Sequence, residues 1–585
     1  MPIDIFGFLR DSFCIMLAWL FLAISFFSWG HCFAKILNLK ISSYKGIIAK
    51  IWLGWVFGIF FYTVYNLFLP INAFASCIFY FPAFIFFIIK YLKKVPGFIK
   101  PISLKNKIAI ILTLFIAATV SIQLPMNFDT GLYHFNNIRW ANEHHIIKGL
   151  GNLHTRLGFN QSFFLYSASL NFHPYLNDYA YHVANSFLYA LFCISMILGG
   201  TIVDYLLLAL FFYIPMPYFW INNPTPDMAS TLVQITAFRY FIEVIYYKNS
   251  NKINIFAFVG ILLAVMVSLK LSNAVLALGL GLIIIFILSK SSIDKTDKKL
   301  IKSIFSFIAI YFIIWVLRGY IQTGYPLFPS SIGRIDFDWT VPLELTNKTE
   351  KEIYAYAKLN NYDYNSPLLN NWGWIDSWLK ESFFNVDDGS LNFYSIILMV
   401  FFPMTMIYWG IGSLTLLIVS LLLFTFWLIS AFSNKNIWNK SKLLLCLFTT
   451  EIISILFWFF TAPNPRFANG IFVLLFTTVL ILIKVSFPKI KVKKDIKNGF
   501  LFYSFFMFLI CFCCDYSNDE FTITKMQIIR KINMNNYVTN SGLKILVPAK
   551  KEENCWDSDL PSTTEPNPYL ALRGQSIDDG FCIKK

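Results

Sequence analysis

Long apolar runs recur along this chain, and they constrain its fold more than any other feature. A helix that crosses the hydrocarbon core of a bilayer needs about 20 consecutive apolar residues. Runs that approach or reach this length lie at 11–30, 51–69, 72–90, 108–125, 180–198, 202–220, 229–247, 254–270, 273–290, 304–320, 412–432, 443–461, 470–486 and 498–514. Because lipid offers no hydrogen-bond partners, each run must satisfy its own backbone as a helix. The sequence therefore predicts an all-α polytopic membrane protein with about fourteen transmembrane helices.

The distribution of basic residues predicts how these helices are oriented. The net charge of +16 would also suit a protein that binds nucleic acid, but the lysines gather in short loops between apolar runs. The most basic loops are KYLKKVPGFIKPISLKNK, KSSIDKTDKKLIK and KIKVKKDIK. Cytoplasmic loops are enriched in Lys and Arg, so these loops are expected inside. Both termini and the polar segments 126–179, 318–391 and 515–585 are then outside, and no nucleic-acid partner is expected.

One apolar run does not fit this orientation. The stretch LNFYSIILMVFFPMTMIYW at 391–409 is hydrophobic enough to cross, but counting it would place the basic loop SNKNIWNKSK outside. We therefore expect 391–409 to be a re-entrant or interfacial element.

The first outer segment predicts a surface helix over 132–148. Its apolar and polar residues fall on opposite sides: Leu132, Phe135 and Ile138 against His134, Asn137 and His144. Such a helix is expected to lie along the outer membrane surface, with further amphipathic helices on the same face.

Histidines are concentrated in the same region. Six of the seven lie there: His134, His144, His145, His154, His173 and His182. One interpretation is a metal site, although the spacing matches no Cys/His zinc pattern. The other is a polar interface beside lipid headgroups. A divalent metal ion is thus the one candidate cofactor.

Asp129, in MNFDTGLYHFNNIRW, is the leading candidate for a catalytic group. It follows a transmembrane run directly, at the depth where an ionised carboxylate meets water. A carboxylate there can act as a general base toward a hydroxyl. The alternative is that Asp129 only caps the helix that follows, because Asp is among the best N-cap residues.

Other charges are expected at the outer ends of the helices. Asp227 follows two prolines in WINNPTPDMAS, and Arg466 lies in the proline-rich turn TAPNPRFANG. Lys270 and Arg318 lie at further outer ends. Arginine suits phosphate or carboxylate, although it can also extend to the membrane interface. Asp227 can likewise be only a cap. Together these groups are typical of a site for an anionic substrate, with His134 and Arg139 as further substrate contacts.

Charges within the apolar runs are few. Arg239 and Glu243 are four residues apart and are expected to pair on one helix face, whereas the role of Glu451 stays open. In the polar tail, Cys555 and Cys582 are expected in an oxidising exterior, where a disulfide can form between them.

The segments FDTGLYH, the helix after it and the acidic second outer turn resemble the GT-C membrane glycosyltransferases, which include protein O-mannosyltransferases and the aminoarabinose transferase of lipid A. DTGLYHFNNIRW, NLHTRLGFN, GYPLFPSS and APNPRFANG are also similar to a family of bacterial membrane proteins associated with surface-polysaccharide synthesis. The resemblance implies that Asp129 is the catalytic base and that Asp227 positions the acceptor or a metal. It also implies that Arg466, Lys270 or Arg318 neutralises the leaving phosphate.

The resemblance also implies an organisation of the chain. Accessory helices at 1–107 precede a GT-C-like core at 108–320, an outer loop at 321–391, C-terminal helices at 392–514 and a tail at 515–585.

The expected activity is inverting transfer of a sugar from a polyprenyl-phosphate donor to a glycan or lipid acceptor, at the outer face of a bacterial inner membrane. Two alternatives remain open: a polymerase of O-antigen or capsule repeat units, and a transporter of lipid-linked sugars. Membrane lipid and other polysaccharide-assembly proteins are the remaining expected partners.

Overall fold

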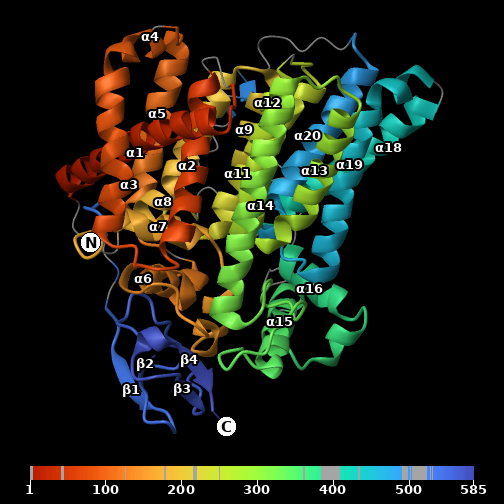
Figure 1. Ribbon diagram of the computed structural model, residues 1–585. Coiled ribbons are helices and arrows are strands. Elements are labelled where there is room, and N and C mark those ends of the chain that lie inside the picture. The colour runs from red at the N-terminus through yellow and green to blue at the C-terminus, as the bar shows by residue number, and fades with distance from the viewer. Residues whose placement is uncertain are drawn as a thin grey trace.

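The computed structural model describes residues 4–40, 45–99, 101–125, 127–176, 179–214, 220–249, 251–359, 363–383, 409–432, 435–489, 499–500, 502–503, 523–527, 529 and 531–584. Within these residues the chain forms a bundle of long helices, and its only strands are four short ones near the C-terminal end of the sequence (Figure 1). Twelve described helices are long and apolar enough to cross a membrane. The chain is therefore an all-α, multi-pass membrane protein, as its apolar runs predicted.

The helices follow the predicted runs closely. The first part of the chain forms α1 (Ile5–Ile36), α2 (Lys45–Tyr65), α3 (Ala73–Tyr91), α4 (Val95–Ile99), α5 (Leu104–Ser121), α6 (Phe135–Glu143), α7 (Phe163–Leu170), α8 (Ala180–Gly199) and α9 (Ile202–Tyr213). The second part forms α11 (Pro226–Ile245), α12 (Lys252–Leu269), α13 (Ala274–Ser289), α14 (Lys295–Thr323), α15 (Leu343–Lys358), α16 (Trp374–Phe383), α18 (Trp409–Phe432), α19 (Lys435–Thr461) and α20 (Asn469–Ser486).

Two of the fourteen predicted spans are not among the long helices. The run at 202–220 contains α9, which has 12 residues and ends early. Its last turn stops at Ile214, whose backbone is extended because Pro215 follows it in the sequence. The predicted span at 498–514 lies almost wholly outside the described residues, as does the re-entrant element predicted at 391–409.

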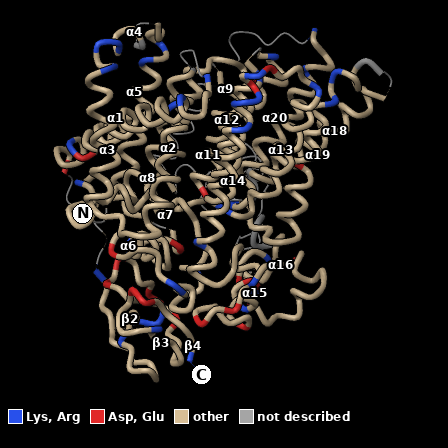
Figure 2. Tube along the Cα trace, in the orientation of Figure 1, with Lys and Arg blue, Asp and Glu red and all other residues tan. Residues whose placement is uncertain are grey.

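The two ends of the bundle differ in composition. At one end, here called the tail end, α6, α15, α16 and the four strands lie together (Figure 1). Many Lys and Arg residues lie at the opposite end, near α4 and α9 (Figure 2). The basic residues near α4 and α9 are thus at the end of the bundle opposite the tail.

The tail forms two small antiparallel sheets that the sequence did not predict. β1 (Met534–Val538) pairs with β2 (Lys544–Pro548), and β3 (Leu570–Leu572) pairs with β4 (Phe581–Ile583). Cys555 and Cys582 are both buried and both free, so the expected disulfide is not formed. Cys582 lies within β4, whereas Cys555 adjoins Trp556, which packs against Gly131.

The surface helix predicted over 132–148 is shorter and more buried than expected. A π-helical turn at Thr130–His134 leads into α6, which ends at Glu143 because His144 is extended. His134 is buried although it was expected on a polar face, and Asn136 is buried as well. The tail covers α6, since Asn136 Nδ2 donates a hydrogen bond to the carbonyl of Trp556 at 3.2 Å. The helix therefore packs between the bundle and the tail.

Candidate functional site

The turn that carries Asp129 is fixed by neighbouring amide side chains. The backbone N–H of Asp129 donates to Asn127 Oδ1 at 2.9 Å, and Thr130 Oγ1 donates to Asn223 Oδ1 at 3.2 Å. Asp129 precedes the π-helical turn, but its carboxylate makes no capping hydrogen bond. The interpretation of Asp129 as only a helix cap is therefore wrong.

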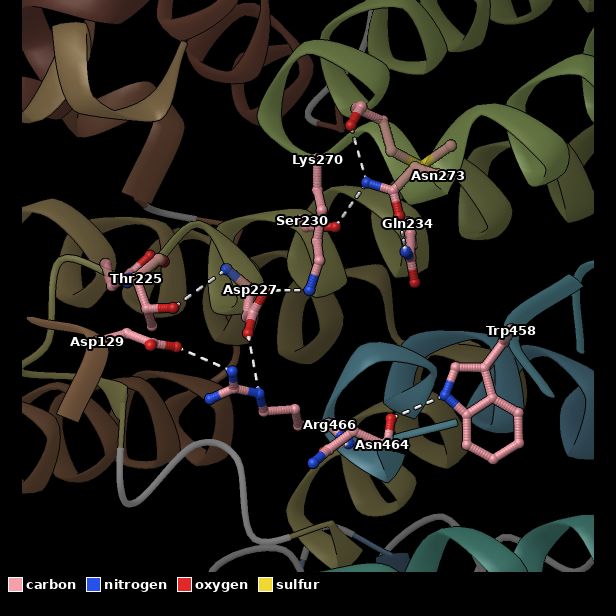
Figure 3. A network of polar contacts seen from close by, with 12 residues as sticks. Asp129, Thr225, Asp227, Ser230, Gln234, Lys270, Asn273, Trp458, Asn464 and Arg466 are labelled. Carbon is pink, nitrogen blue, oxygen red and sulfur yellow. Dashed lines mark hydrogen bonds and ion pairs between the residues drawn. The ribbon is translucent and has the colours of Figure 1, made fainter. Parts of the chain in front are cut away.

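Arg466 occupies the space between two carboxylates. Its Nη2 donates to Asp129 Oδ2 at 2.8 Å, and its Nε lies 3.9 Å from Asp227 Oδ2 (Figure 3). The guanidinium also lies over the ring of Tyr356, 4.9 Å from the centroid. Arg466 comes from the short turn Pro465–Phe467 between α19 and α20. It points into the protein, so the interpretation of Arg466 as an interfacial side chain is also wrong.

Asp227 is held from its other side by Lys270. The Lys270 ammonium donates to Asp227 Oδ1 and lies over the ring of Phe467, 3.7 Å from its centroid. The cap of α11 is Thr225, whose hydroxyl accepts from the backbone N–H of Asp227 at 3.3 Å. The carboxylate of Asp227 is thus available to the site and is not the helix cap.

A polar network fixes the turn that carries Lys270. Asn273 Nδ2 donates to Ser230 Oγ at 2.7 Å, and Gln234 Nε2 donates to Asn273 Oδ1 at 2.6 Å (Figure 3). Gly470 lies against the same network, because a Cβ there would be 1.9 Å from Gln234 Oε1. The network therefore ties α11, the α12–α13 turn and α20 together behind the ion pairs.

The ion-paired side chains of Asp129, Asp227, Lys270 and Arg466 line one cavity of about 180 Å³ near the tail end of the bundle. Its charged side chains are three cations and two carboxylates: Arg156, Lys270, Arg466, Asp129 and Asp227. Aromatic side chains form much of the remaining wall: Tyr133, Phe159, Tyr356, Phe457, Trp458 and Phe467. The cavity thus combines one net positive charge with apolar ring faces, which suits an anionic ligand that also carries a sugar.

The ion pairs set the protonation of Asp129. Burial alone would raise the pKa of this carboxyl, but the charges of Arg466 and Arg156 outweigh it and lower the pKa to about 2. Burial lowers the pKa of His134 to about 4. At neutral pH the site therefore holds an ionised Asp129 beside a neutral His134, whose Nδ1 lies 3.1 Å from Thr130 Oγ1.

Five of the seven candidate residues come together in this cavity: Asp129, His134, Asp227, Lys270 and Arg466. Arg139 does not. It binds Glu143 at 2.6 Å and Asp559 at 2.7 Å, and it donates to the carbonyl of Asp557 at 3.0 Å. Arg139 is thus an anchor for the tail and does not line this cavity.

Arg318 also lies outside this cavity. It lines a second, smaller cavity beside Asn66 and Gln322. Arg318 and Arg466 are both near the outer end of a helix. The rotation of α14 about its axis, however, turns Arg318 toward α2. The sequence does not reveal that rotation, which places Arg318 at the second cavity and not at the cavity that contains Arg466.

Two groups at the cavity were not selected from the sequence. Arg156 lies in NLHTRLGFN, one of the segments noted for its resemblance, and that position is a signal that could have identified it. Tyr356 belongs to α15 in the outer loop, where many aromatic residues offered no way to choose one.

The clustered histidines separate into different roles. His144 Nδ1 lies 2.8 Å from Asp578 Oδ1 in the tail, and His182 Nδ1 lies 2.6 Å from the carbonyl of Ser121. In the part of the chain that the structure describes, no three His, Cys, Asp or Glu side chains form a group that could hold a metal ion.

Comparisons with known proteins give one match. A family model described as a domain of unknown function (DUF8201) matches residues 13–434. No curated protein and no solved structure matches the chain.

Proposed function

The chain belongs to the DUF8201 family, whose function is unknown, and we propose that it is an inverting glycosyltransferase that uses a sugar linked to a polyprenyl phosphate. In this proposal the sugar passes to a glycan or lipid acceptor. The reaction takes place at the outer face of a bacterial inner membrane, during assembly of a surface polysaccharide.

The arrangement of Asp129, Arg466 and Asp227 in one cavity is the observation that carries this proposal. Glycosyl transfer from a phosphate needs a base for the incoming hydroxyl and a cation for the departing phosphate. Here a carboxylate and a guanidinium lie within 2.8 Å of each other, with Lys270 and Arg156 in the same cavity.

The proposed step uses these groups as follows. The acceptor hydroxyl oxygen forms a bond to the anomeric carbon, and the bond from that carbon to the phosphate oxygen breaks. The hydroxyl proton passes to Asp129, and the electron pair of the broken bond stays on the phosphate, beside Arg466. Attack from the face opposite the phosphate inverts the anomeric carbon.

Because Asp129 contacts Arg466, binding of the donor phosphate at Arg466 also changes the basicity of Asp129. With a pKa of about 2, the paired Asp129 is a weak base. A phosphate that binds Arg466 competes with Asp129 for the guanidinium, and loss of that partner makes the carboxylate more basic. Donor binding therefore prepares the base for the acceptor.

The depth of the site suits a donor that stays in the membrane. Asp129 follows the end of α5, and Arg466 lies between the membrane helices α19 and α20. A sugar on a polyprenyl phosphate is held at this level by its lipid chain. A transporter of lipid-linked sugars would need polar groups along a path through the bilayer. The buried charge of Arg239 is instead paired with Asp204 at 2.8 Å and with Glu243 at 2.6 Å, which favours an enzyme.

Sugar transfer by purified protein in lipid nanodiscs tests the proposal. Synthetic polyprenyl-phosphate hexoses serve as donors, and glycan extracted from a host strain that lacks the gene serves as acceptor. D129N is expected to lose about 10²–10⁴-fold in rate. D336N is the matched control, because Asp336 is exposed and pairs only with Arg334 in the described ion pairs. Full activity in D129N, or no transfer by the wild type from any donor of the set, contradicts the proposal.

A further inference from the structure

A second cavity adjoins the first, and Gln161 lines both. It holds about 30 Å³. Its polar lining comes from the end of α2, α6, the following loops and α14: Asn66, Asn137, His145, Asn160, Gln161, Arg318 and Gln322. This small polar cavity therefore shares a wall residue with the cavity that contains Asp129 and Arg466.

Arg318 is a buried cation with only neutral partners. Its exposed fraction is 3%. Nη2 donates to Asn66 Oδ1 at 3.2 Å and Nη1 donates to the carbonyl of Thr63 at 3.5 Å, whereas Nε makes no hydrogen bond. No ion pair joins Arg318 to a carboxylate among the residues that the structure describes. A buried charge without a counter-charge is costly, so this guanidinium is suited to an anion from outside the chain.

Other buried polar atoms at this cavity also have no partner. Trp140 Nε1 is a donor without an acceptor, and the side-chain oxygens of Gln161 and Gln322 are without donors. A Gln amide can present either its oxygen or its nitrogen. The cavity can therefore offer several N–H donors around one group, together with Arg318 Nε.

We propose that this second cavity binds a carboxylate group of the substrate whose phosphate is held at Arg466. A water molecule needs about 10–15 Å³ of such volume, so the cavity has room for about two oxygen-sized atoms. This matches the two oxygens of a carboxylate and is too small for the four of a phosphate. The planar fork of arginine also binds a carboxylate through two parallel hydrogen bonds. The carboxylate site depends only on Arg318 and its neighbours, whereas its assignment to a substrate that carries an acidic sugar rests on the proposed function.

Thermal unfolding of the full-length protein in detergent tests the carboxylate site. Sodium acetate is compared with sodium chloride at equal ionic strength, and the melting temperature of the wild type is expected to rise by roughly 1 °C in acetate. R318M is expected to lose this rise. R334M is the matched control and is expected to keep it, because Arg334 is more exposed and pairs with Asp336 at 2.6 Å.

The chloride measurement separates binding from a purely structural role. If Arg318 serves the ligand, R318M is at least as stable as the wild type in chloride, because an unpaired buried charge has been removed. A lower melting temperature of R318M in both salts, with no response of the wild type to acetate, overturns the proposal. If R318M does not fold, W140F and R318K carry the test, since the first loses one donor and the second loses the planar fork. An acetate response equal to that of the wild type in both variants also overturns it.

Binding of sugar phosphates tests the assignment to the substrate. Glucuronic acid 1-phosphate is expected to bind at least tenfold more weakly to R318M than to the wild type, whereas glucose 1-phosphate is expected to bind both equally. R466M is expected to weaken both ligands. Equal loss of both ligands in R318M contradicts the assignment. These measurements use no transfer reaction, so D129N can be inactive or active without changing their outcome.

Discussion

Arg466 Nη2 lies 2.8 Å from Asp129 Oδ2, although 337 positions separate the two residues in the chain. Both side chains are largely shielded, with 13% and 15% of their surface exposed. Removing Arg466 therefore leaves Asp129 without an ion pair in a shielded site, whereas Arg466 without Asp129 still has Asp227 at 3.9 Å.

A double-mutant cycle on this pair should reveal that dependence. R466M alone is expected to destabilise the protein by about 3 kcal/mol, because Asp129 is left unpaired in a shielded site. D129N combined with R466M should be clearly more stable than R466M alone. Thermal unfolding of the four proteins measures the coupling, and additive effects of the two substitutions would contradict it.

Acid should weaken the wild type more than D129N. The pKa of Asp129 is lowered from 3.8 to about 2, so its stabilisation is complete above about pH 4 and is lost as the pH falls toward 2. The contribution at neutral pH is about 2 kcal/mol. Melting temperatures measured from pH 6 to pH 2 should converge between wild type and D129N at the acid end. Parallel curves over that range would show that Asp129 does not titrate as a paired carboxylate.

Under the proposed function, K270M should weaken donor binding more than it slows the chemical step. Lys270 is held by Asp227 and adds one cation to the cavity, but Arg466 is the group beside Asp129. Loss of a charge-assisted hydrogen bond to phosphate corresponds to about 1.5–3 kcal/mol, or roughly ten- to a hundredfold in KM. K348M is the control, because Lys348 is exposed and pairs with Glu352 on α15. A fall in kcat with KM unchanged would place Lys270 in the chemical step instead.

G131A should displace the tail from the Asp129 turn. A Cβ on Gly131 would lie 2.6 Å from Trp556 Cε2, and the carbonyl of Gly131 accepts a hydrogen bond from the backbone N–H of Trp556 at 2.8 Å. The expected cost is about 1–3 kcal/mol, with faster proteolysis of the tail. G281A is the control, because a Cβ there meets nothing within 4 Å. Equal stability and equal proteolysis of the two variants would contradict this packing.

Hydropathy predicted most of the helices because the bilayer imposes their length, whatever they pack against. The distribution of Lys and Arg among the loops predicted which loops share a face, and so the meeting of Asp129, Asp227 and Arg466 could be anticipated. It could not distinguish Arg466 from Arg318, because the direction of a side chain depends on how its helix is rotated. Nor could it place Arg139, whose partners Asp557 and Asp559 belong to the tail.

The packing of Trp556 on Gly131 has a consequence for biogenesis. The turn that holds Asp129 is made early, but its ionic partner and its cover are made several hundred residues later. A ribosome must therefore have passed position 556, and the membrane insertion machinery must have delivered that segment to the side where Asp129 lies, before the site is complete. Nascent chains shorter than this are expected to be sensitive to proteases at the Asp129 turn even when all twelve described long helices are already inserted.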